Sequence, residues 1–179
     1  MRTTLDPKLQ VIARKALVAG LVRYDRTQGW RGPVKRIPLA GEWGAALAKI
    51  EIPTDIKPWE LAIVLEADRK KAVIGIRPGR LKSGKIAKQR LTGEIAFKQM
   101  SWARAAAEEK DGKKGKLGPK PKALSDVLKP GDVIYAAPLE GAKGQWQLMQ
   151  IPLVEGALVA MDPHTGRVHV NAVYQHDKS

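Results

Sequence analysis

Short stretches of alternating apolar and polar residues recur between residues 60 and 170, and they constrain the fold more than any other feature. Glu60–Glu66 and Lys71–Arg77 flank Ala67–Lys70, an arrangement typical of a β-hairpin. Further segments of this kind are 92–97, 133–136, 144–151, 157–161 and 167–170. Several short strands separated by turn-forming residues favour a small antiparallel barrel over a parallel sheet. We therefore predict a mainly β protein built on such a barrel.

The N-terminal region follows a helical period instead. Apolar residues recur at i, i+3 and i+4 spacing from residue 9 to 21. Asp6 is suited to cap the first turn, and Pro7 loses no needed hydrogen bond at the first helical position. The pattern predicts an amphipathic helix over residues 3–25 that ends near residues 28–29. Its apolar stripe requires a partner surface.

Turn chemistry marks the rest of the chain. Residues 108–122 are rich in Lys, Gly and Pro and carry no apolar face, so we predict a mobile loop there. Pro130 and Gly131 predict a turn that leads into a strand. Asp162–Gly166 predicts a second turn, which joins the last two strands into a C-terminal hairpin.

The positive charge is concentrated rather than spread. Of the 32 Lys and Arg residues in this chain of 179 residues, 17 lie between residues 66 and 122, with only 6 of the 18 acidic residues. Such a surface favours an anionic partner, although a solvated face without a dedicated ligand has the same composition. The candidate binding strip comprises Arg69, Lys70, Lys71, Arg77, Arg80, Lys82 and Lys85, with Trp102 as a candidate stacking residue.

The tryptophans are ambiguous in the same way. Trp30, Trp43, Trp59, Trp102 and Trp146 make up five of the nine aromatic residues. Exposed beside the basic strip they would stack on bases or sugars. Because each adjoins a turn or an alternating strand, we expect partial burial with a hydrogen-bonded indole N–H instead.

Catalytic and metal motifs are incomplete. Gly79–Ile86 resembles a phosphate-binding loop, but Ile86 replaces the required hydroxyl residue, so a basic hairpin is favoured. Asp162, His164 and His169 are better explained by a turn and a strand than by a metal site. No serine begins an S-x-x-K motif, and the chain contains no cysteine. We predict no catalytic residue, no cofactor and no membrane-spanning segment within these 179 residues.

Five segments resemble conserved landmarks of one protein family. They are Thr3–Gln10, Gly29–Pro33, Trp102–Arg104, Leu128–Ile134 and Glu155–Val168. The chain resembles the middle region of class A penicillin-binding proteins, and within them the 1A type of Gram-negative bacteria. The likeness spans nearly the whole sequence. The sequence departs from the family after Glu155–Val168, where Val170–Gln175 replaces the usual Ala-Met-Val-Gly-Gly sequence.

The resemblance implies three regions. Residues 1–29 are similar to the helix that flanks the transpeptidase domain. Residues 30–154 are similar to the inserted OB-like domain, a small barrel with the oligonucleotide/oligosaccharide-binding topology. Residues 155–179 are similar to the opening hairpin of a transpeptidase domain, so the chain looks like an excised middle. Proteins of this family combine a membrane-anchored glycosyltransferase with a serine transpeptidase on the periplasmic side of the inner membrane.

Two functions follow as hypotheses. The first is a non-catalytic spacer and docking module in cell-wall synthesis. Its partners would be the adjoining glycosyltransferase and transpeptidase domains, with peptidoglycan or a periplasmic regulatory protein as candidate ligands of the basic strip. The second is a basic OB-fold protein that binds nucleic acid, which composition alone permits. The family-like ends of the chain have no place in that alternative.

Overall fold

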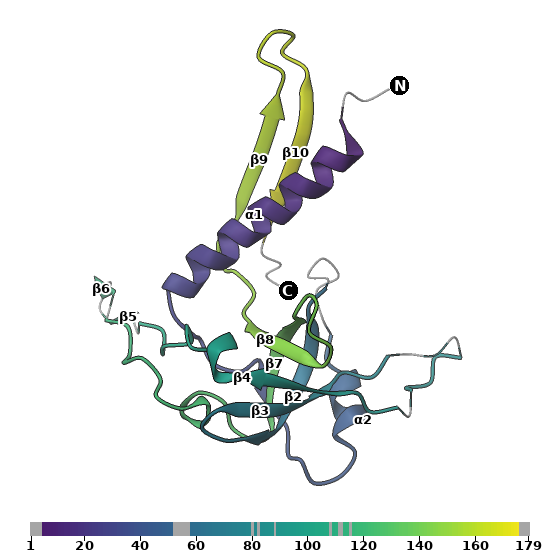
Figure 1. Cartoon of the computed structure of the whole chain (residues 1–179), viewed down its shortest axis with the longest axis vertical. Coiled ribbons are helices and arrows are strands. Elements are labelled where there is room, and N and C mark those ends of the chain that lie inside the picture. The colour runs from purple at the N-terminus through teal and green to yellow at the C-terminus, as the bar shows by residue number, and fades with distance from the viewer. Residues whose placement is uncertain are drawn as a thin grey trace. The chain divides into compact units, whose positions relative to one another are not determined.

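The computed structural model describes residues 5–51, 58–79, 81, 83–87, 89–107, 109–110, 113–114 and 116–175. The chain divides into two compact units (Figure 1). The barrel unit comprises residues 28–150, and the helix–hairpin unit comprises residues 1–27 with 151–179.

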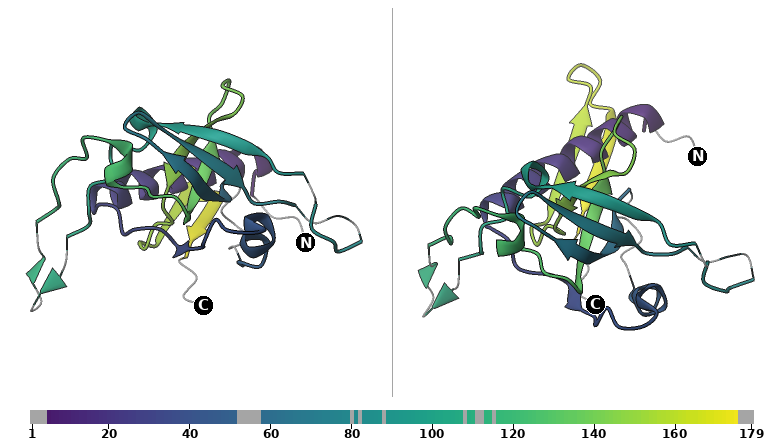
Figure 2. Two further views of the ribbon diagram at one scale, coloured as in Figure 1. Left: turned by 90° about the horizontal axis from the view of Figure 1, so that it is seen from below. Right: turned by 60° about the horizontal axis from the view of Figure 1, so that its bottom comes forward.

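A closed five-stranded barrel forms the centre of the barrel unit (Figure 2). Its strands are β2 (Glu60–Ala67), β3 (Lys71–Ile76), β4 (Thr92–Ala96), β7 (Asp132–Pro138) and β8 (Gln145–Met149). They pair in the order β7-β2-β3-β4-β8, and β8 pairs back with β7. The barrel confirms the predicted fold class, with one difference. Strands β4 and β8 are parallel, because strand direction cannot alternate all the way round a ring of five.

Short elements decorate this barrel, and most of them lie in its connections. They are β1 (Lys35–Arg36), α2 (Trp43–Ala48), η1 (Phe97–Gln99), β5 (Glu109–Lys110), β6 (Lys113–Lys114) and η2 (Leu124–Asp126), where η denotes a 3₁₀ helix. The helix α2 is not predicted by the sequence analysis, although Trp43 and Leu47 have the i, i+4 spacing of a helical face.

The predicted mobile loop falls partly outside the described residues. Residues 108, 111, 112 and 115 are not described, while β5 and β6 pair with each other. Nearer the end of the segment, Gly118 donates its N–H to the Ala105 carbonyl and accepts a hydrogen bond from Arg104 Nε at 2.7 Å. The mobility of 108–122 stays a prediction, and limited trypsin digestion with first cleavage in this segment would support it.

The core of the barrel consists of aliphatic side chains from alternate strand positions. Ile74, Ile95, Ile134 and Leu148 are fully buried there, together with Leu124 of η2. Alternation places these residues inside because successive side chains of a strand point to opposite faces. All five tryptophans are buried or half-buried, as expected, and three of them, Trp30, Trp102 and Trp146, pack against this core.

Two strand glycines make room for two of those indole rings. A Cβ on Gly75 would lie 2.5 Å from the Trp43 ring, and a Cβ on Gly93 would overlap the Trp146 ring. The aromatic ring in each case covers a strand position that has no side chain of its own. Trp43 also lies beneath the guanidinium of Arg90, 5.8 Å from the ring centre.

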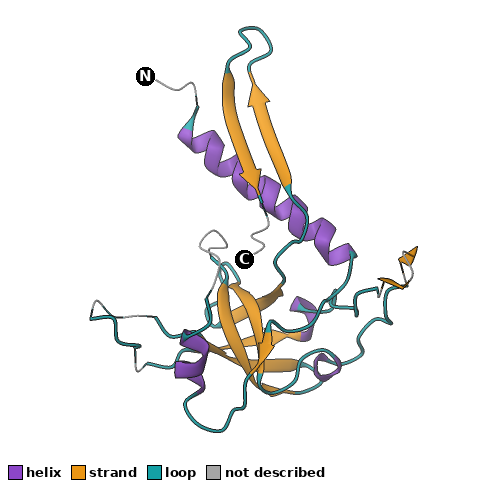
Figure 3. Cartoon of the chain, turned by 180° about the vertical axis from the view of Figure 1, so that it is seen from behind, coloured by secondary structure: helices purple, strands orange, loops and turns teal. Residues whose placement is uncertain are grey.

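The helix–hairpin unit contains α1 (Pro7–Thr27), β9 (Gly156–Met161) and β10 (Val168–Tyr174) (Figure 3). As predicted, Asp6 caps α1, because its carboxylate accepts the backbone N–H groups of Lys8 and Leu9. Strand β10 runs to Tyr174, so the strand is formed despite the departure from the family sequence.

One edge of this hairpin is covered by α1. The Asp6 N–H bonds to the His169 carbonyl, the Gln10 amide bonds to both backbone groups of Asn171, and Arg14 donates to the Val173 carbonyl. Donors four residues apart on the helix thus meet strand residues two apart. The fit follows from geometry, because four helical residues rise about 6 Å and two strand residues about 6.7 Å.

The opposite edge, on β9, has no such cover among the described residues. Asn171 faces Val159 in the pairing register, and the backbone groups of Asn171 are used by Gln10 rather than by β9. The backbone groups of Val159 therefore point away from β10. Large apolar side chains of this unit are also exposed, including Ile12 at 62%, Met161 at 58% and Val159 at 55%.

Candidate functional site

The predicted basic strip separates into two groups at opposite ends of β3. Arg69, Lys70 and Lys71 are exposed at the turn between β2 and β3. Arg77 and Lys85 follow the other end of β3, while Arg80 and Lys82 lie outside the described residues. The strip residues that the structure describes therefore do not form one continuous surface.

The turn group is held by local acidic residues. The Asp68 carboxylate accepts the backbone N–H groups of Lys70 and Lys71, and these hydrogen bonds hold the pKa of Asp68 below its usual value. Lys71 pairs with Glu94 at 2.7 Å, which raises the pKa of Lys71. Arg69 and Lys70 remain as exposed cations at the tip, with no ion pair to a described residue.

Arg77 is a structural residue rather than a surface cation. Its guanidinium is partly buried, and Nη2 donates to the Ala48 carbonyl at 3.1 Å, at the end of α2. Lys85 lies in the small hairpin that the sequence predicts. There the N–H of Leu81 bonds to the Lys85 carbonyl and that of Ala87 bonds to the Gly79 carbonyl.

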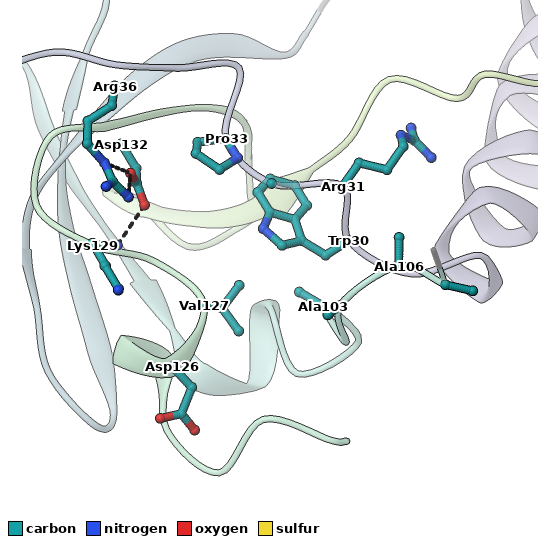
Figure 4. A pocket seen from close by; sticks show the side chains of 13 residues that line it. Trp30, Arg31, Pro33, Arg36, Ala103, Ala106, Asp126, Val127, Lys129 and Asp132 are labelled. Carbon is teal, nitrogen blue, oxygen red and sulfur yellow. Dashed lines mark hydrogen bonds and ion pairs between the residues drawn. The ribbon is translucent and has the colours of Figure 1, made fainter. Parts of the chain in front are cut away.

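A groove of about 530 Å³ in the barrel unit is a second candidate site, and it is more enclosed than the exposed basic turn (Figure 4). Small apolar residues, Pro33, Ala103, Ala106 and Val127, line much of it around the indole of Trp30. Its charged lining residues are Arg31, Arg36, Asp126, Lys129 and Asp132. In Figure 4 the Arg31 side chain extends away from the groove.

The position of Trp30 in this groove is fixed by backbone pairing. Its N–H bonds to the Arg104 carbonyl at 2.6 Å, and its carbonyl accepts the N–H of Ala106. The Trp30 ring meets the edge of Trp102 with 6.0 Å between ring centres. Trp102 thus packs against Trp30 and the barrel core, and its role as a stacking residue stays a prediction.

The Trp30 side chain is 9% exposed, yet no hydrogen bond among the described residues uses its indole N–H. Figure 4 shows this nitrogen on the side of the ring that faces Lys129 and Asp132. From the sequence we expect each indole N–H to be hydrogen-bonded, and Trp30 departs from that expectation. An indole N–H at the groove wall with no acceptor among the described residues is available to a ligand.

Asp132 is 1% exposed and fully paired at one end of the groove. Its Oδ1 accepts two bonds from Arg36, from Nε and Nη2, each at 2.8 Å, and its Oδ2 accepts the backbone N–H of Lys129 at 2.8 Å. This carboxylate closes the predicted turn, in which Gly131 adopts a φ of 89°. Arg36 compensates the charge of Asp132, so the Lys129 ammonium adds positive charge to the groove.

Asp126 brings the opposite charge to another part of the lining. Its carboxylate accepts the backbone N–H groups of Ala123 and Lys122, which lowers its pKa. The sequence does not predict this groove, because Trp30, Ala103 and Lys129 are far apart along the chain. The Trp30 and Lys129–Asp132 segments are recognisable in sequence, but their proximity depends on the barrel.

The histidine-containing turn holds its own backbone. The Asp162 carboxylate accepts the N–H groups of His164 and Thr165, and these bonds lower its pKa. Among the described residues there is no group of three side chains able to hold a metal ion. His176 lies outside the described residues. In the part of the chain that the structure describes, no helix is long and apolar enough to span a membrane.

The fold and its comparisons define the class of this protein. A five-stranded barrel closed by one parallel pair is an OB-like barrel. The family model described as penicillin-binding protein OB-like domain matches residues 30–154. The chain belongs to this family.

Its relatives are penicillin-binding proteins of the 1A type. The chain is 34% identical to penicillin-binding protein 1A of Rickettsia prowazekii and 28% identical to that of Escherichia coli, with 93% of this chain covered. It also matches a crystal structure of penicillin-binding protein 1A from Haemophilus influenzae with a TM-score of 0.58 and 26% identity, over 95% of this chain and 21% of that chain. The chain spans less than a fifth of the length of the two sequence relatives, 17% and 18%.

Proposed function

We propose that the barrel unit is a non-catalytic spacer and docking module of a cell-wall synthesis protein that carries glycosyltransferase and transpeptidase domains. The parent protein would be anchored on the periplasmic side of the inner membrane. Family membership supports this assignment, because the relatives are penicillin-binding proteins many times longer than the barrel. The sequence contributes a second argument, since no serine begins the S-x-x-K motif that penicillin-reactive enzymes require.

The observation that carries the proposal is the way the chain enters and leaves the barrel unit. Gln150 is 7% exposed, and its side-chain amide donates to the Gly29 carbonyl at 3.0 Å and accepts the N–H of Arg31 at 2.9 Å. The two ends of the barrel unit therefore lie side by side. A domain whose ends meet is suited to insertion into another domain without disturbing it.

The helix–hairpin unit fits the opening part of a transpeptidase domain in this proposal. Its open β9 edge and exposed apolar residues on α1 and β9 need a covering surface. A further strand and core of the same parent protein would supply that surface. The glycosyltransferase and transpeptidase domains are thus the first partners we propose for this chain.

Nucleic-acid binding is the weaker alternative. The tryptophans pack around the barrel core, where they present little face for base stacking. The cations at the β2–β3 turn are accompanied by Asp68 and Glu94. If the turn is a docking surface, the proposed ligands are peptidoglycan or a periplasmic regulatory protein.

Two assays on the 179-residue chain test the proposal. Incubation with a fluorescent penicillin should label nothing, and a stable acyl adduct in the mass spectrum would contradict the non-catalytic assignment. Co-sedimentation with purified peptidoglycan at physiological salt should exceed binding to single-stranded DNA at the same salt. Stronger retention by DNA would instead favour the nucleic-acid alternative.

A further inference from the structure

We propose that the Trp30 groove binds a peptide carboxylate, with small aliphatic residues of the ligand against its apolar lining. The inference rests on the proposed function, because it names a ligand class for the same module. It concerns a different surface from the basic turn, and it depends on three features of the groove.

The first feature is a pair of donors without described acceptors. The Trp30 side chain is nine-tenths buried, and its indole N–H lies on the side of the ring that faces Lys129 and Asp132 (Figure 4). No hydrogen bond or ion pair among the described residues uses Nζ of Lys129. A neutral N–H and an ammonium on neighbouring parts of one groove suit an acceptor that carries negative charge.

The second feature is the distribution of charge. Asp132 already accepts hydrogen bonds from Arg36 and from the Lys129 backbone, so its charge is compensated. Asp126 keeps its negative charge but is held by the backbone of Lys122 and Ala123. Lys129 is therefore the cation near Trp30 that has no acidic partner among the described residues. A single carboxylate of the ligand would provide that partner.

The third feature is the size of the apolar lining. Pro33, Ala103, Ala106 and Val127 are small or compact residues, and the open groove has a volume of about 530 Å³. Volumes of this order accommodate a short ligand rather than a folded partner. Small aliphatic side chains next to a carboxylate fit this combination, as in a peptide that ends in alanine.

The test uses the 179-residue chain labelled with ¹⁵N and two probes, N-acetyl-alanyl-alanine and its C-terminal amide. The Trp30→Phe variant assigns the Trp30 indole resonance, because it removes the N–H and retains an aromatic ring. Titration with the free acid to about 20 mM should move this resonance to saturation. The amide should bind at least about fivefold more weakly, because it lacks the charge that Lys129 attracts.

Two lysine variants locate the interaction. Lys129→Gln should weaken binding of the free acid about tenfold, while Lys143→Gln, an exposed lysine in the β7–β8 connection, should leave it unchanged. An unmoved Trp30 indole, equal affinity for acid and amide, or equal loss in both variants would overturn the carboxylate site. Those results would leave penicillin labelling and peptidoglycan sedimentation as they were, so failure of the groove is distinguishable from failure of the proposed function.

Discussion

The two units of this chain differ in how the edges of their strands are paired. The barrel pairs every one of its five strands on both sides, and its aliphatic core is fully buried. The hairpin covers the edge of β10 with side chains from α1 but leaves the edge of β9 open. From this difference we expect the barrel to fold on its own contacts and the helix–hairpin unit to be stabilised by a further surface.

The largest expected effect is on the free energy of unfolding, which should fall in a barrel variant and hardly change in a hairpin variant. Ile134→Ala removes a fully buried side chain from the barrel and should lower the free energy of unfolding by about 3 kcal/mol. Val159→Ala, on the exposed face of β9, should change it by less than about 0.5 kcal/mol. Circular dichroism during chemical denaturation is the measurement, because it reports both units; tryptophan fluorescence, recorded in parallel, reports the barrel unit, which contains all five tryptophans. Equal losses in the two variants would remove the contrast.

A smaller effect is expected where the barrel unit begins and ends. Gln150→Leu leaves the Gly29 carbonyl and the Arg31 N–H without their partner, which should cost about 2 kcal/mol in the same denaturation experiment. Gln147→Leu, on the more exposed part of β8, is the matched control and should stay within about 0.5 kcal/mol. A neutral Gln150→Leu variant would show that the two chain ends are not held by this amide.

Charge reversal at the β2–β3 turn tests binding rather than stability. Replacing Arg69, Lys70 and Lys71 with Glu should abolish the salt-sensitive part of peptidoglycan binding, because their side chains are exposed at one tip. The fold should survive, which circular dichroism would verify. The control reverses three exposed charges of the other unit, Lys8, Lys15 and Arg23, and should have a weaker effect. Full retention by the turn variant would identify the tip as a solvated basic face without a ligand.

Acid should weaken one turn in each unit, with the smallest effect of this series. The pKa values of Asp68 and Asp162 are lowered because each carboxylate accepts two backbone N–H groups. A lowered pKa stabilises the folded turn above the ordinary carboxyl pKa of about 3.8, and this stabilisation is lost as pH falls through the lower native value. The amide shift of Lys70 should thus be constant from about pH 8 to 5 and change below about pH 4, and the amide of Thr165 should show a change in the same acid range. A change near neutral pH at the Asp68 turn, which contains no histidine, would contradict this origin.

The sequence predicts those parts of the molecule whose cause is local. The Asp6 cap, the Pro130–Gly131 turn and the alternating strands depend on neighbouring residues, and all three are present. The parallel pairing of β4 with β8 is a property of ring closure and has no local signal. Charge density likewise predicts a basic surface, but it does not reveal that β3 separates the turn cations from Arg77 or that Arg77 is held by Ala48.

The groove shows the same limit for function. Trp30 and Lys129 are each visible in the sequence as parts of family-like segments, and nothing near either residue indicates the other. The barrel brings them to one groove through the pairing of residues 30–31 with Gln150 and Arg104. Composition therefore points to the exposed basic turn first, although the groove, which carries charges of both signs, is the more enclosed of the two sites.

Amide hydrogen exchange on the 179-residue chain tests most directly whether a closed barrel is joined to an open hairpin. Strands β2, β3 and β7 should exchange slowest, because each is paired antiparallel on both edges, whereas β4 and β8 meet in a short parallel pairing. The N–H of Val159 should exchange far faster, since its register points it to the uncovered edge, while that of Asn171, bonded to Gln10, should be protected. Equal protection of Val159 and the barrel strands would contradict the account.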